Sequence, residues 1–260
     1  MLQIRIGLQL ASLRLPFAQA AKVARQLNVE AVEIDARGEL NPVALSGTGR
    51  RQIRKLLDDL QLKVAVVSFR TRRGYNVNEE LDRRVEATRE AMRLAFDLGA
   101  PIVVNQIGRV PDKPEGESWR LLVEVLSDLG RDGQRIGALL AAETGSEDGA
   151  TLAELLRALP TGSLAVDFNP GNLIVNGFSA AAAVRALAPY VFHVHATDAV
   201  RDLARGRGVN VPLGSGAADY HDLLSVLEEQ RFHGYLTVER PAAANPLLEI
   251  EQAIDYLRGL

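Results

Sequence analysis

Four short apolar runs in the second half of the chain indicate its fold, because each ends in an acidic residue or a histidine. The runs are Leu139–Glu143 (LLAAE), Leu164–Asp167 (LAVD), Val191–His195 (VFHVH) and Tyr235–Glu239 (YLTVE). Polar or turn-forming residues follow each run at once, as expected where a buried strand ends. Side chains alternate between the two faces of a strand, so the last residue of each run can lie on an inner row. Parallel neighbouring strands would bring these last residues together: Glu143, Asp167, His195 and Glu239.

This convergence predicts a divalent cation between the four side chains. Three carboxylates crowded together repel one another unless a positive charge holds them in place. Three carboxylates and one imidazole suit Mn²⁺, Mg²⁺ or Co²⁺ better than a dedicated tetrahedral Zn²⁺ site. The chain has no cysteine, which excludes a thiolate zinc site and a disulfide framework.

The rest of the chain repeats a strand followed by a helix. The predicted strands are Ile4–Leu10, Ala31–Asp35, Val64–Phe69, Ile102–Ile107, Ile136–Ala142, Leu164–Val166, Val191–Val194 and Tyr235–Val238. The predicted helices are Pro16–Leu27, a helix capped by Ser46 and ending near Leu60, Asn78–Leu98, Ser118–Leu129, Thr151–Leu159, Ser179–Ala188, Asp219–Gln230 and Pro246–Leu260. Eight such units without a shift in composition predict one (β/α)8 TIM barrel domain over residues 1–260. A doubly wound open sheet alternates similarly, but its ligands would gather at one switch point.

Composition places the chain among globular enzymes and binding proteins. Hydrophobic residues make up 47% and charged residues 24% of the 260 residues, and the net charge is −3. This charge gives no reason to expect a nucleic-acid partner. The opening residues, MLQIRIGLQL, predict a first strand rather than a signal peptide, and no apolar stretch approaches membrane-spanning length. We therefore expect a cytoplasmic protein without a membrane partner, and assembly into a homo-oligomer stays open.

Several segments together resemble the xylose isomerase-like barrel family, which includes sugar phosphate isomerases/epimerases and ketose 3-epimerases. The resemblance covers nearly the whole chain. It depends on AAETG, AVDFNPGN, FHVHATD and LTVERP at the four strand ends, and on the glycine-rich segment VPLGSGAADYHDLL before the last unit.

The resemblance implies a metal site and an activity. In the family, a glutamate, an aspartate, a histidine and a glutamate on these strands bind one divalent metal, and they match Glu143, Asp167, His195 and Glu239 in order. The implied reaction moves a proton next to the carbonyl of a sugar or sugar phosphate through an enediolate. The family uses the two glutamates as acid/base groups, so Glu143 and Glu239 are the expected catalytic residues.

One position departs from the family pattern. Many epimerases of the family carry a substrate-contacting histidine three residues after the strand-six aspartate, where this chain has Pro170. Asn169 or Asn172 could take over that contact, and the identity of the sugar cannot be carried over. The family's epimerases also have a substrate arginine in the loop after strand seven, and Arg201 is the candidate here.

Other polar residues have more than one interpretation each. His193 shares the inward parity of His195 but lies one layer deeper. It is a satisfied interior side chain, a group that supports the ligands from behind, a metal ligand or a substrate-binding residue. Asp198 either orients His195, touches substrate or caps a loop. Glu33 and Asp35 either reach substrate hydroxyls or pair with an arginine.

Arginines gather in loops that a barrel places on its catalytic side. They are Arg70, Arg72, Arg73, Arg109, Arg201, Arg205 and Arg207. This concentration suggests an anionic substrate, phosphorylated or carboxylated, although arginine is common in solvated loops in any case.

Three alternative functions compete with isomerisation. Apurinic-site endonucleases of the same fold have a three-metal site built with many histidines. This chain has four histidines and a negative net charge, which argues against that function. A dehydratase of a keto-inositol type would use the same metal and base but expel a hydroxyl group. A non-catalytic sugar-binding protein would bind ligand without turnover, and the complete ligand set argues against it.

Overall fold

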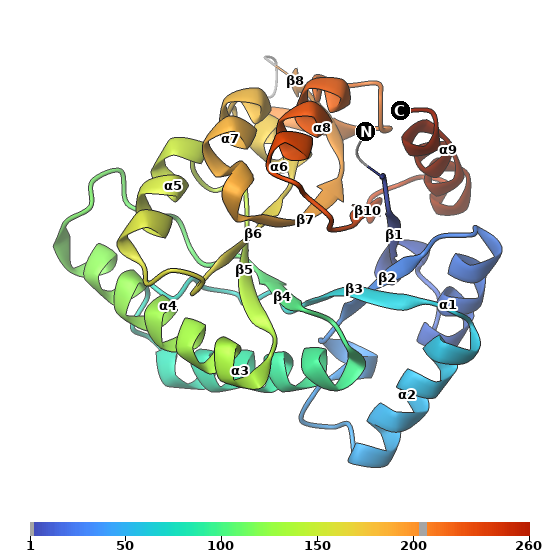
Figure 1. Ribbon diagram of the computed structural model, residues 1–260, viewed down its shortest axis with the longest axis horizontal. Coiled ribbons are helices and arrows are strands. Elements are labelled where there is room, and N and C mark those ends of the chain that lie inside the picture. Colours follow the sequence, from blue (N-terminus) through green and yellow to red (C-terminus); the bar gives the residue numbers. More distant parts are fainter. Residues whose placement is uncertain (1–2, 203–206) are drawn as a thin grey trace.

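The computed structural model describes residues 3–202 and 207–260, and eight parallel strands in this part of the chain close into a barrel (Figure 1). Strand β10 pairs with β7 on one side and with β1 on the other, which closes the ring and removes the open-sheet alternative. The barrel strands are β1 (Ile6–Gln9), β2 (Ala31–Asp35), β3 (Lys63–Ser68), β4 (Ile102–Asn105), β5 (Leu139–Glu143), β6 (Ala165–Phe168), β7 (Val191–Ala196) and β10 (Leu236–Val238). The predicted TIM barrel is confirmed.

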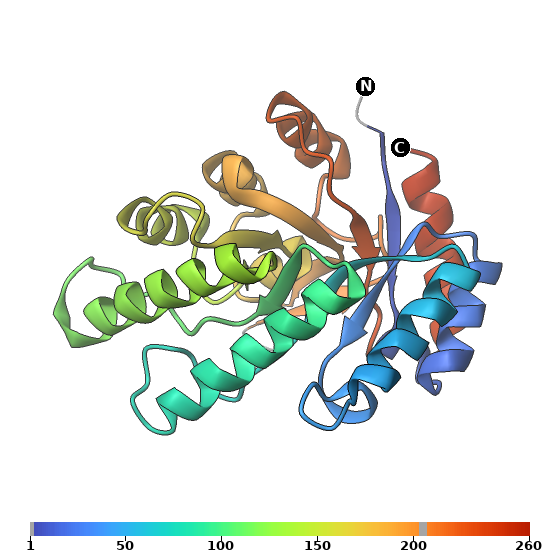
Figure 2. The ribbon, with the colours of Figure 1, turned by 60° about the horizontal axis from the view of Figure 1, so that its bottom comes forward.

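Helices surround the barrel, as Figures 1 and 2 show. Ser46, Asp148, Ser179 and Asp219 each accept a hydrogen bond from the first turn of the helix that follows. The helices are α1 (Phe17–Gln26), α2 (Gly47–Asp59), α3 (Leu81–Leu98), α4 (Gly116–Ile136), α5 (Gly149–Ala158), α6 (Pro170–Val175), α7 (Ala180–Leu187), α8 (Tyr220–Glu229) and α9 (Pro246–Arg258), with short 3-10 turns η1 (Leu10–Leu13), η2 (Gly38–Leu40) and η3 (Ala188–Tyr190).

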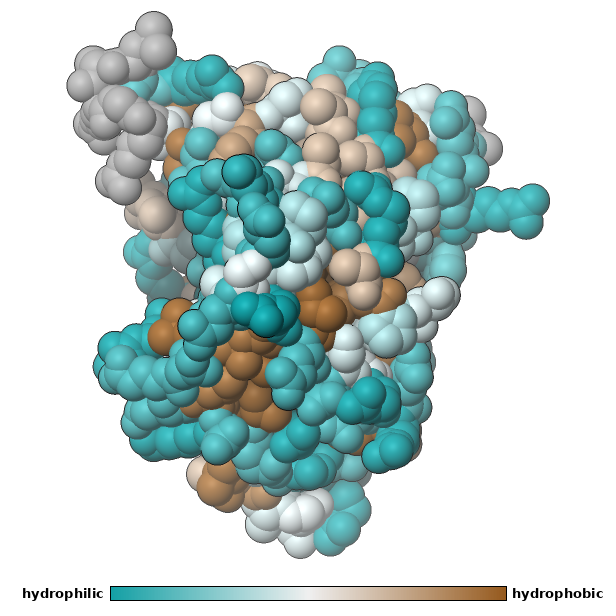
Figure 3. Space-filling view, turned by 90° about the vertical axis from the view of Figure 1, so that its left-hand side faces the viewer, coloured by the Kyte–Doolittle hydropathy of each residue, from teal (hydrophilic) through white to brown (hydrophobic). Residues whose placement is uncertain are grey.

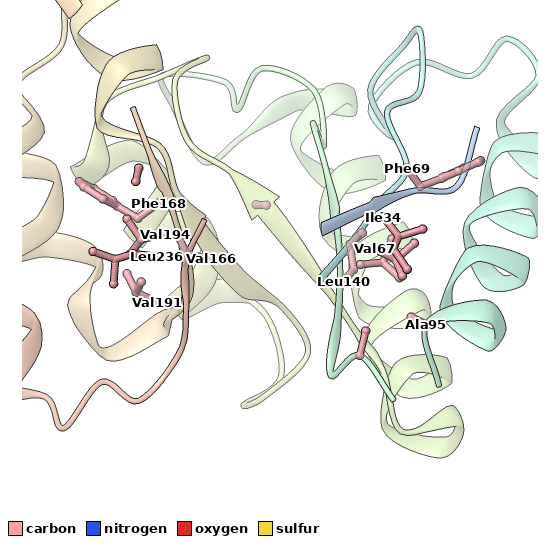
Figure 4. Packing of buried hydrophobic residues seen from close by; sticks show 14 of the residues in the cluster. Ile34, Val67, Phe69, Ala95, Leu140, Val166, Phe168, Val191, Val194 and Leu236 are labelled. Carbon is pink, nitrogen blue, oxygen red and sulfur yellow. The ribbon is translucent and has the colours of Figure 1, made fainter. Parts of the chain in front are cut away.

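The hydrophobic core has two layers, one on each side of the strands. Figure 4 shows the outer layer on two sides of the barrel, with Ile34 and Val67 on one side and Phe168, Val194 and Leu236 on the other. The inner layer fills the barrel with small and branched side chains: Ala31, Ala65, Val66, Ile102, Val104, Ala141 and Ala165. Two residues further along several of these strands, the inner row becomes polar, and the floor of the candidate site begins there.

Helix α4 is longer than the sequence predicts. The sequence places its end at Leu129, before two glycines, but the helix continues to Ile136. A Cβ atom on Gly130 would lie 2.4 Å from Cβ of Ser163, so glycine is required here by packing and does not end the helix. Tertiary contact has outweighed the low helix propensity of glycine.

The segment after β7 also differs from the loop that the sequence predicts over residues 196–216. It contains an antiparallel pair, β8 (Asp198–Asp202) and β9 (Arg207–Val211), which lies against α6. Helix α6 was not predicted either, although Pro170 stands at its first position, where proline is well tolerated.

The described helices include none that is both long and apolar enough to cross a membrane. The face shown in Figure 3 is largely hydrophilic and carries a hydrophobic area near its centre.

Substitution of Gly130 by alanine tests the packing of α4. Helix propensity alone predicts a gain of about 1 kcal/mol for Gly→Ala inside a helix. Because the new methyl group would meet Ser163, we expect the free energy of unfolding to fall by about 1–3 kcal/mol instead. Urea denaturation of Gly130→Ala beside Gly47→Ala checks this, since a Cβ on Gly47 meets no atom closer than 3.8 Å. A Gly130→Ala variant as stable as the Gly47→Ala variant would contradict the packing argument.

Candidate functional site

The four predicted ligand residues meet at the carboxyl ends of neighbouring strands. Glu143 ends β5 and stands beside Asp167 of β6, and His195 of β7 stands beside Thr237 of β10, two residues before Glu239. All four are buried: Asp167 and His195 expose 0% of their surface, Glu143 3% and Glu239 7%. The pairing of the strands therefore gathers four ionisable side chains in one water-poor space.

Asp167 links the two histidines of β7. Its Oδ2 atom accepts a hydrogen bond from Nδ1 of His195 at 2.6 Å, and its Oδ1 atom accepts one from Nδ1 of His193 at 2.7 Å. The other ring nitrogen of His193 is hydrogen-bonded to Oγ1 of Thr237 at 2.7 Å. Both nitrogens of His193 thus have protein partners beneath the site.

Glu33 fixes the orientation of the His195 ring from the opposite side. Its Oε2 atom lies 2.6 Å from Nε2 of His195, and Gln9 donates through Nε2 to Glu33 Oε1 and to Glu239 Oε1, both at 3.0 Å. The sequence predicts that Glu33 reaches substrate hydroxyls or an arginine, but the structure pairs it with His195. Glu33 holds the Nε2 atom of His195 and leaves the Nδ1 atom facing the predicted ligands. Metal-binding histidines commonly have a carboxylate partner on the ring nitrogen that does not bind the metal.

Glu143 and Glu239 contact the same guanidinium nitrogen at the carboxyl ends of the strands. Nη2 of Arg70 lies 3.3 Å from Glu143 Oε1 and 2.9 Å from Glu239 Oε1. Asn169 donates to Glu143 Oε1 at 3.0 Å and to Glu239 Oε2 at 3.4 Å, and Asn172 donates to Glu143 Oε1 at 3.1 Å. The two glutamates therefore share two donors, Arg70 and Asn169.

Burial and charge pull the pKa values of the site apart. Burial raises the pKa of Glu143 to about 7, against the attraction of Arg70 and His195. Burial also opposes ionisation of Glu33, but His195 outweighs it and lowers the pKa of Glu33 to about 2. Burial disfavours the charge on His195 as well, yet Asp167 and Glu33 raise its pKa well above the ordinary value. Glu143 is the carboxyl group of this set that can change protonation near neutral pH.

The residues fit a divalent cation. Among the described residues, two groups could hold an ion, Asp167 with His193 and His195, and Glu143 with His195 and Glu239, with the ligand atoms in each group within 4.8 Å of one another. His195 belongs to both groups, and its Nδ1 atom lies 3.9 Å from Glu143 Oε1. Carboxylate oxygens with one imidazole nitrogen are donors for a hard divalent metal, and the charge of such an ion would offset the repulsion between the crowded buried carboxylates.

The other predicted site residues divide into those that contact the predicted ligands and those with contacts elsewhere. Asn169 and Asn172 reach Glu143, as described above. Arg201 donates instead to the backbone oxygen of Gly177. Arg205 lies outside the described residues, and only the backbone of Arg207 is described.

Asp198 organises the loop after β7. Its two carboxylate oxygens accept backbone hydrogen bonds from Ala199, Gly214, Gly216 and Ala218. A Cβ atom on Gly216 would lie 2.1 Å from Oδ1 of Asp198, so glycine allows this close approach. These contacts correspond to the loop-capping alternative for Asp198.

Some residues of the site escape sequence reasoning. The positions of Gln9 and Thr237 in their strands predict side chains that point into the barrel. Neither residue is a common metal ligand, so residue type alone does not identify them as part of the site. Gln106, which donates to Glu143 Oε2 at 3.4 Å, follows β4 with the same parity. Parity at every strand end, including β1 and β4, would have found all three.

A family model described as "Xylose isomerase-like TIM barrel" matches residues 21–260. The chain belongs to this family. The proteins named below are similar to the chain, and at these levels of identity the solved structures show a common fold.

The similar proteins include a dehydratase and an epimerase-like protein. An inosose dehydratase from Clostridium beijerinckii is 26% identical over 243 residues, covering 79% of each chain. A xylose isomerase domain protein from Planctomyces limnophilus has a TM-score of 0.83 at 24% identity, over 98% of this chain and 95% of the other. A D-tagatose 3-epimerase-like protein has a TM-score of 0.77 at 18% identity, over 98% and 99%. A xylose isomerase-like protein from Mycobacterium smegmatis, in complex with magnesium, has a TM-score of 0.75 at 17% identity, over 98% and 94%.

The raised pKa of Glu143 predicts a pH dependence of stability in the metal-free protein. The folded state binds this proton more tightly than the unfolded state, whose glutamate has a pKa of about 4.5. The stabilisation from the bound proton is complete at low pH and is lost as the pH rises through about 7. We therefore expect Glu143→Gln to gain stability relative to wild type by a few kcal/mol between pH 5 and 8, because one pKa unit corresponds to about 1.4 kcal/mol.

Urea denaturation at several pH values with a chelator present measures this difference. Glu251→Gln, at an exposed position of α9, is the control and should show no such change with pH. A stability difference between Glu143→Gln and wild type that stays constant from pH 5 to 8 would exclude a raised pKa.

Proposed function

We propose that the protein is a divalent-metal-dependent isomerase or epimerase of a sugar or sugar phosphate, acting by proton transfer next to a carbonyl through an enediolate. One observation carries the proposal: two buried glutamates from β5 and the end of β10 face one point, and the pKa of one of them is about 7. A carboxyl group with this pKa can both accept and return a proton at neutral pH.

Glu143, Asp167, His195 and Glu239 would hold the metal. A bound divalent cation supplies polarisation of the substrate carbonyl and of a neighbouring hydroxyl. Mn²⁺, Mg²⁺ or Co²⁺ suits this donor set better than Zn²⁺. Glu33 and Gln9 keep His195 and Glu239 in orientation through the hydrogen bonds described above.

Glu143 and Glu239 act as the acid/base pair in the proposed reaction. One glutamate removes the proton from the carbon beside the carbonyl. If the other glutamate returns it to the opposite face of that carbon, the product is the epimer. If the same glutamate delivers it to the former carbonyl carbon, and the proton of the neighbouring hydroxyl moves to the former carbonyl oxygen, the product is the aldose–ketose isomer. Asn169 and Asn172 donate to Glu143 and are placed to contact substrate hydroxyls beside it.

A keto-inositol-type dehydratase is the second candidate, and the 26% identity to an inosose dehydratase favours it. It would use the same base to remove the proton, and the intermediate would then expel a hydroxyl group as water. A non-catalytic sugar-binding protein is the third candidate and would need no raised pKa at Glu143.

Metal content tests the first requirement of the proposal. We expect roughly one divalent ion per purified chain, because the two groups of possible ligands share His195 and would hold a single ion between them. Glu239→Gln and His195→Ala should lose the ion, because each removes one buried ligand. His221→Ala, an exposed histidine of α8, is the matched control and should keep it. Elemental analysis after reconstitution that finds no metal in wild type would overturn the proposed mechanism.

Turnover in deuterated water separates the three candidates. With ketoses, sugar phosphates and keto-inositols as substrates and Mn²⁺ or Co²⁺ added, an isomerase or epimerase gives a product of unchanged formula that carries solvent deuterium. A dehydratase gives a product lighter by one water molecule. Glu239→Gln should lower the rate by about 100- to 10,000-fold, the usual contribution of a general acid or base. Binding without turnover of any substrate would instead favour the sugar-binding protein.

A further inference from the structure

Arg70 holds a position that the proposed reaction does not explain. It lies two residues after the end of β3, and its Nη2 atom sits between the carboxylates of Glu143 and Glu239. Within residues 3–202 and 207–260, the ion pairs of these two glutamates with a lysine or arginine are those with Arg70. The guanidinium therefore occupies the space beside the predicted metal ligands.

Charge explains why a cation is needed there when no metal is bound. The side chains of Glu143 and Glu239 are 0% and 7% exposed, and both accept from the same guanidinium nitrogen. Two buried carboxylates that share one donor nitrogen repel strongly because little water screens them. A divalent cation at the same ligands would provide this compensation itself and would repel the guanidinium.

The remainder of the guanidinium is available to a ligand. The side chain of Arg70 is 45% exposed, although the two glutamates it contacts are buried. Its hydrogen bonds to the two glutamates use Nη2. Once Nη2 is released from the glutamates, the guanidinium can offer Nη2 together with Nε or Nη1 as a forked pair of donors. This fork matches a carboxylate or phosphate group in two-point contact, which a lysine ammonium cannot reproduce.

We propose that Arg70 exchanges partners: it neutralises Glu143 and Glu239 in the metal-free protein, and it binds an oxyanion of the substrate once a divalent cation neutralises the glutamates. This inference rests on the proposed metal-dependent reaction and deepens it, because it assigns a phosphate or carboxylate group to the sugar substrate. Metal and anionic substrate would then support each other's binding through one side chain.

A fixed structural clamp is the alternative role for Arg70. A clamp that holds the two carboxylates in the orientation for metal binding would increase metal affinity, so its removal would weaken that affinity. A partner-exchanging counter-ion competes with the metal, so its removal strengthens metal affinity. The two roles therefore predict opposite signs for the same measurement.

The first experiment measures Mn²⁺ affinity by calorimetry, without substrate, in wild type and three variants. Arg70→Met keeps the bulk of the side chain and removes its charge, and we expect it to bind Mn²⁺ about tenfold more tightly or better. Arg70→Lys keeps the charge and should stay near wild type. Arg72→Met, in the same loop at an exposed position, should not change the affinity. Equal or weaker Mn²⁺ binding by Arg70→Met would overturn the exchange.

The metal-free protein supplies a second readout that is independent of activity. With a chelator at pH 8, Arg70→Met should unfold at lower urea concentration than wild type, since the paired carboxylates lose their counter-ion. Arg70→Lys should recover part of this loss. Unchanged stability of Arg70→Met would show that Arg70 does not neutralise the glutamates and would overturn the proposal.

The third measurement tests the oxyanion with Mn²⁺-loaded protein. Fructose 6-phosphate, glucuronate and fructose serve as phosphorylated, carboxylated and neutral probes. We expect wild type to bind one of the two anionic probes at least about tenfold more tightly than fructose, and Arg70→Met to lose that preference. Whichever anionic probe is preferred identifies the group. Equal binding of all three probes by wild type would overturn the substrate assignment, whereas failure of wild type to bind Mn²⁺ would overturn the proposed function itself.

Discussion

The structure depends on one constraint: four carboxylates and two histidines must share a space from which water is excluded. Asp167 satisfies this constraint by accepting from both histidines, and Glu33 accepts from the second ring nitrogen of His195. Buried charges are tolerated only when they are paired and hydrogen-bonded. The resulting chain of contacts fixes each carboxylate in one orientation, so the site is preorganised before any ligand arrives.

The barrel makes this arrangement possible because its interior is apolar along the middle of the strands and polar at their carboxyl ends. Ala141 and Ala165 belong to the apolar inner layer, and Glu143 and Asp167 follow them by two residues on the same strands. The apolar layer excludes water from beneath the carboxylates, which is why burial raises the pKa of Glu143 so far. The same burial makes a divalent cation, or a guanidinium such as that of Arg70, necessary for charge balance.

Much of the fold could be predicted because its signals are local. The alternation of short apolar runs with amphipathic segments identified all eight barrel strands, and Ser46, Ser179 and Asp219 marked the starts of their helices as predicted. The failures have tertiary causes. Helix α4 continues past Gly130 because its backbone packs on Ser163, and the β8–β9 pair forms against α6, a contact between segments separated in sequence.

The sequence by itself determined which residue types stand at the ends of β5, β6, β7 and β10, because side-chain parity is a property of each strand alone. Only the tertiary structure decided their partners. The closed barrel brings Glu33 from β2 to His195 on β7 and Gln9 from β1 to Glu239, and it leaves Arg70 between two glutamates from strands far apart in the chain. The physical reason is that barrel closure and strand stagger set which inward side chains meet across the interior, and no local pattern encodes that distance.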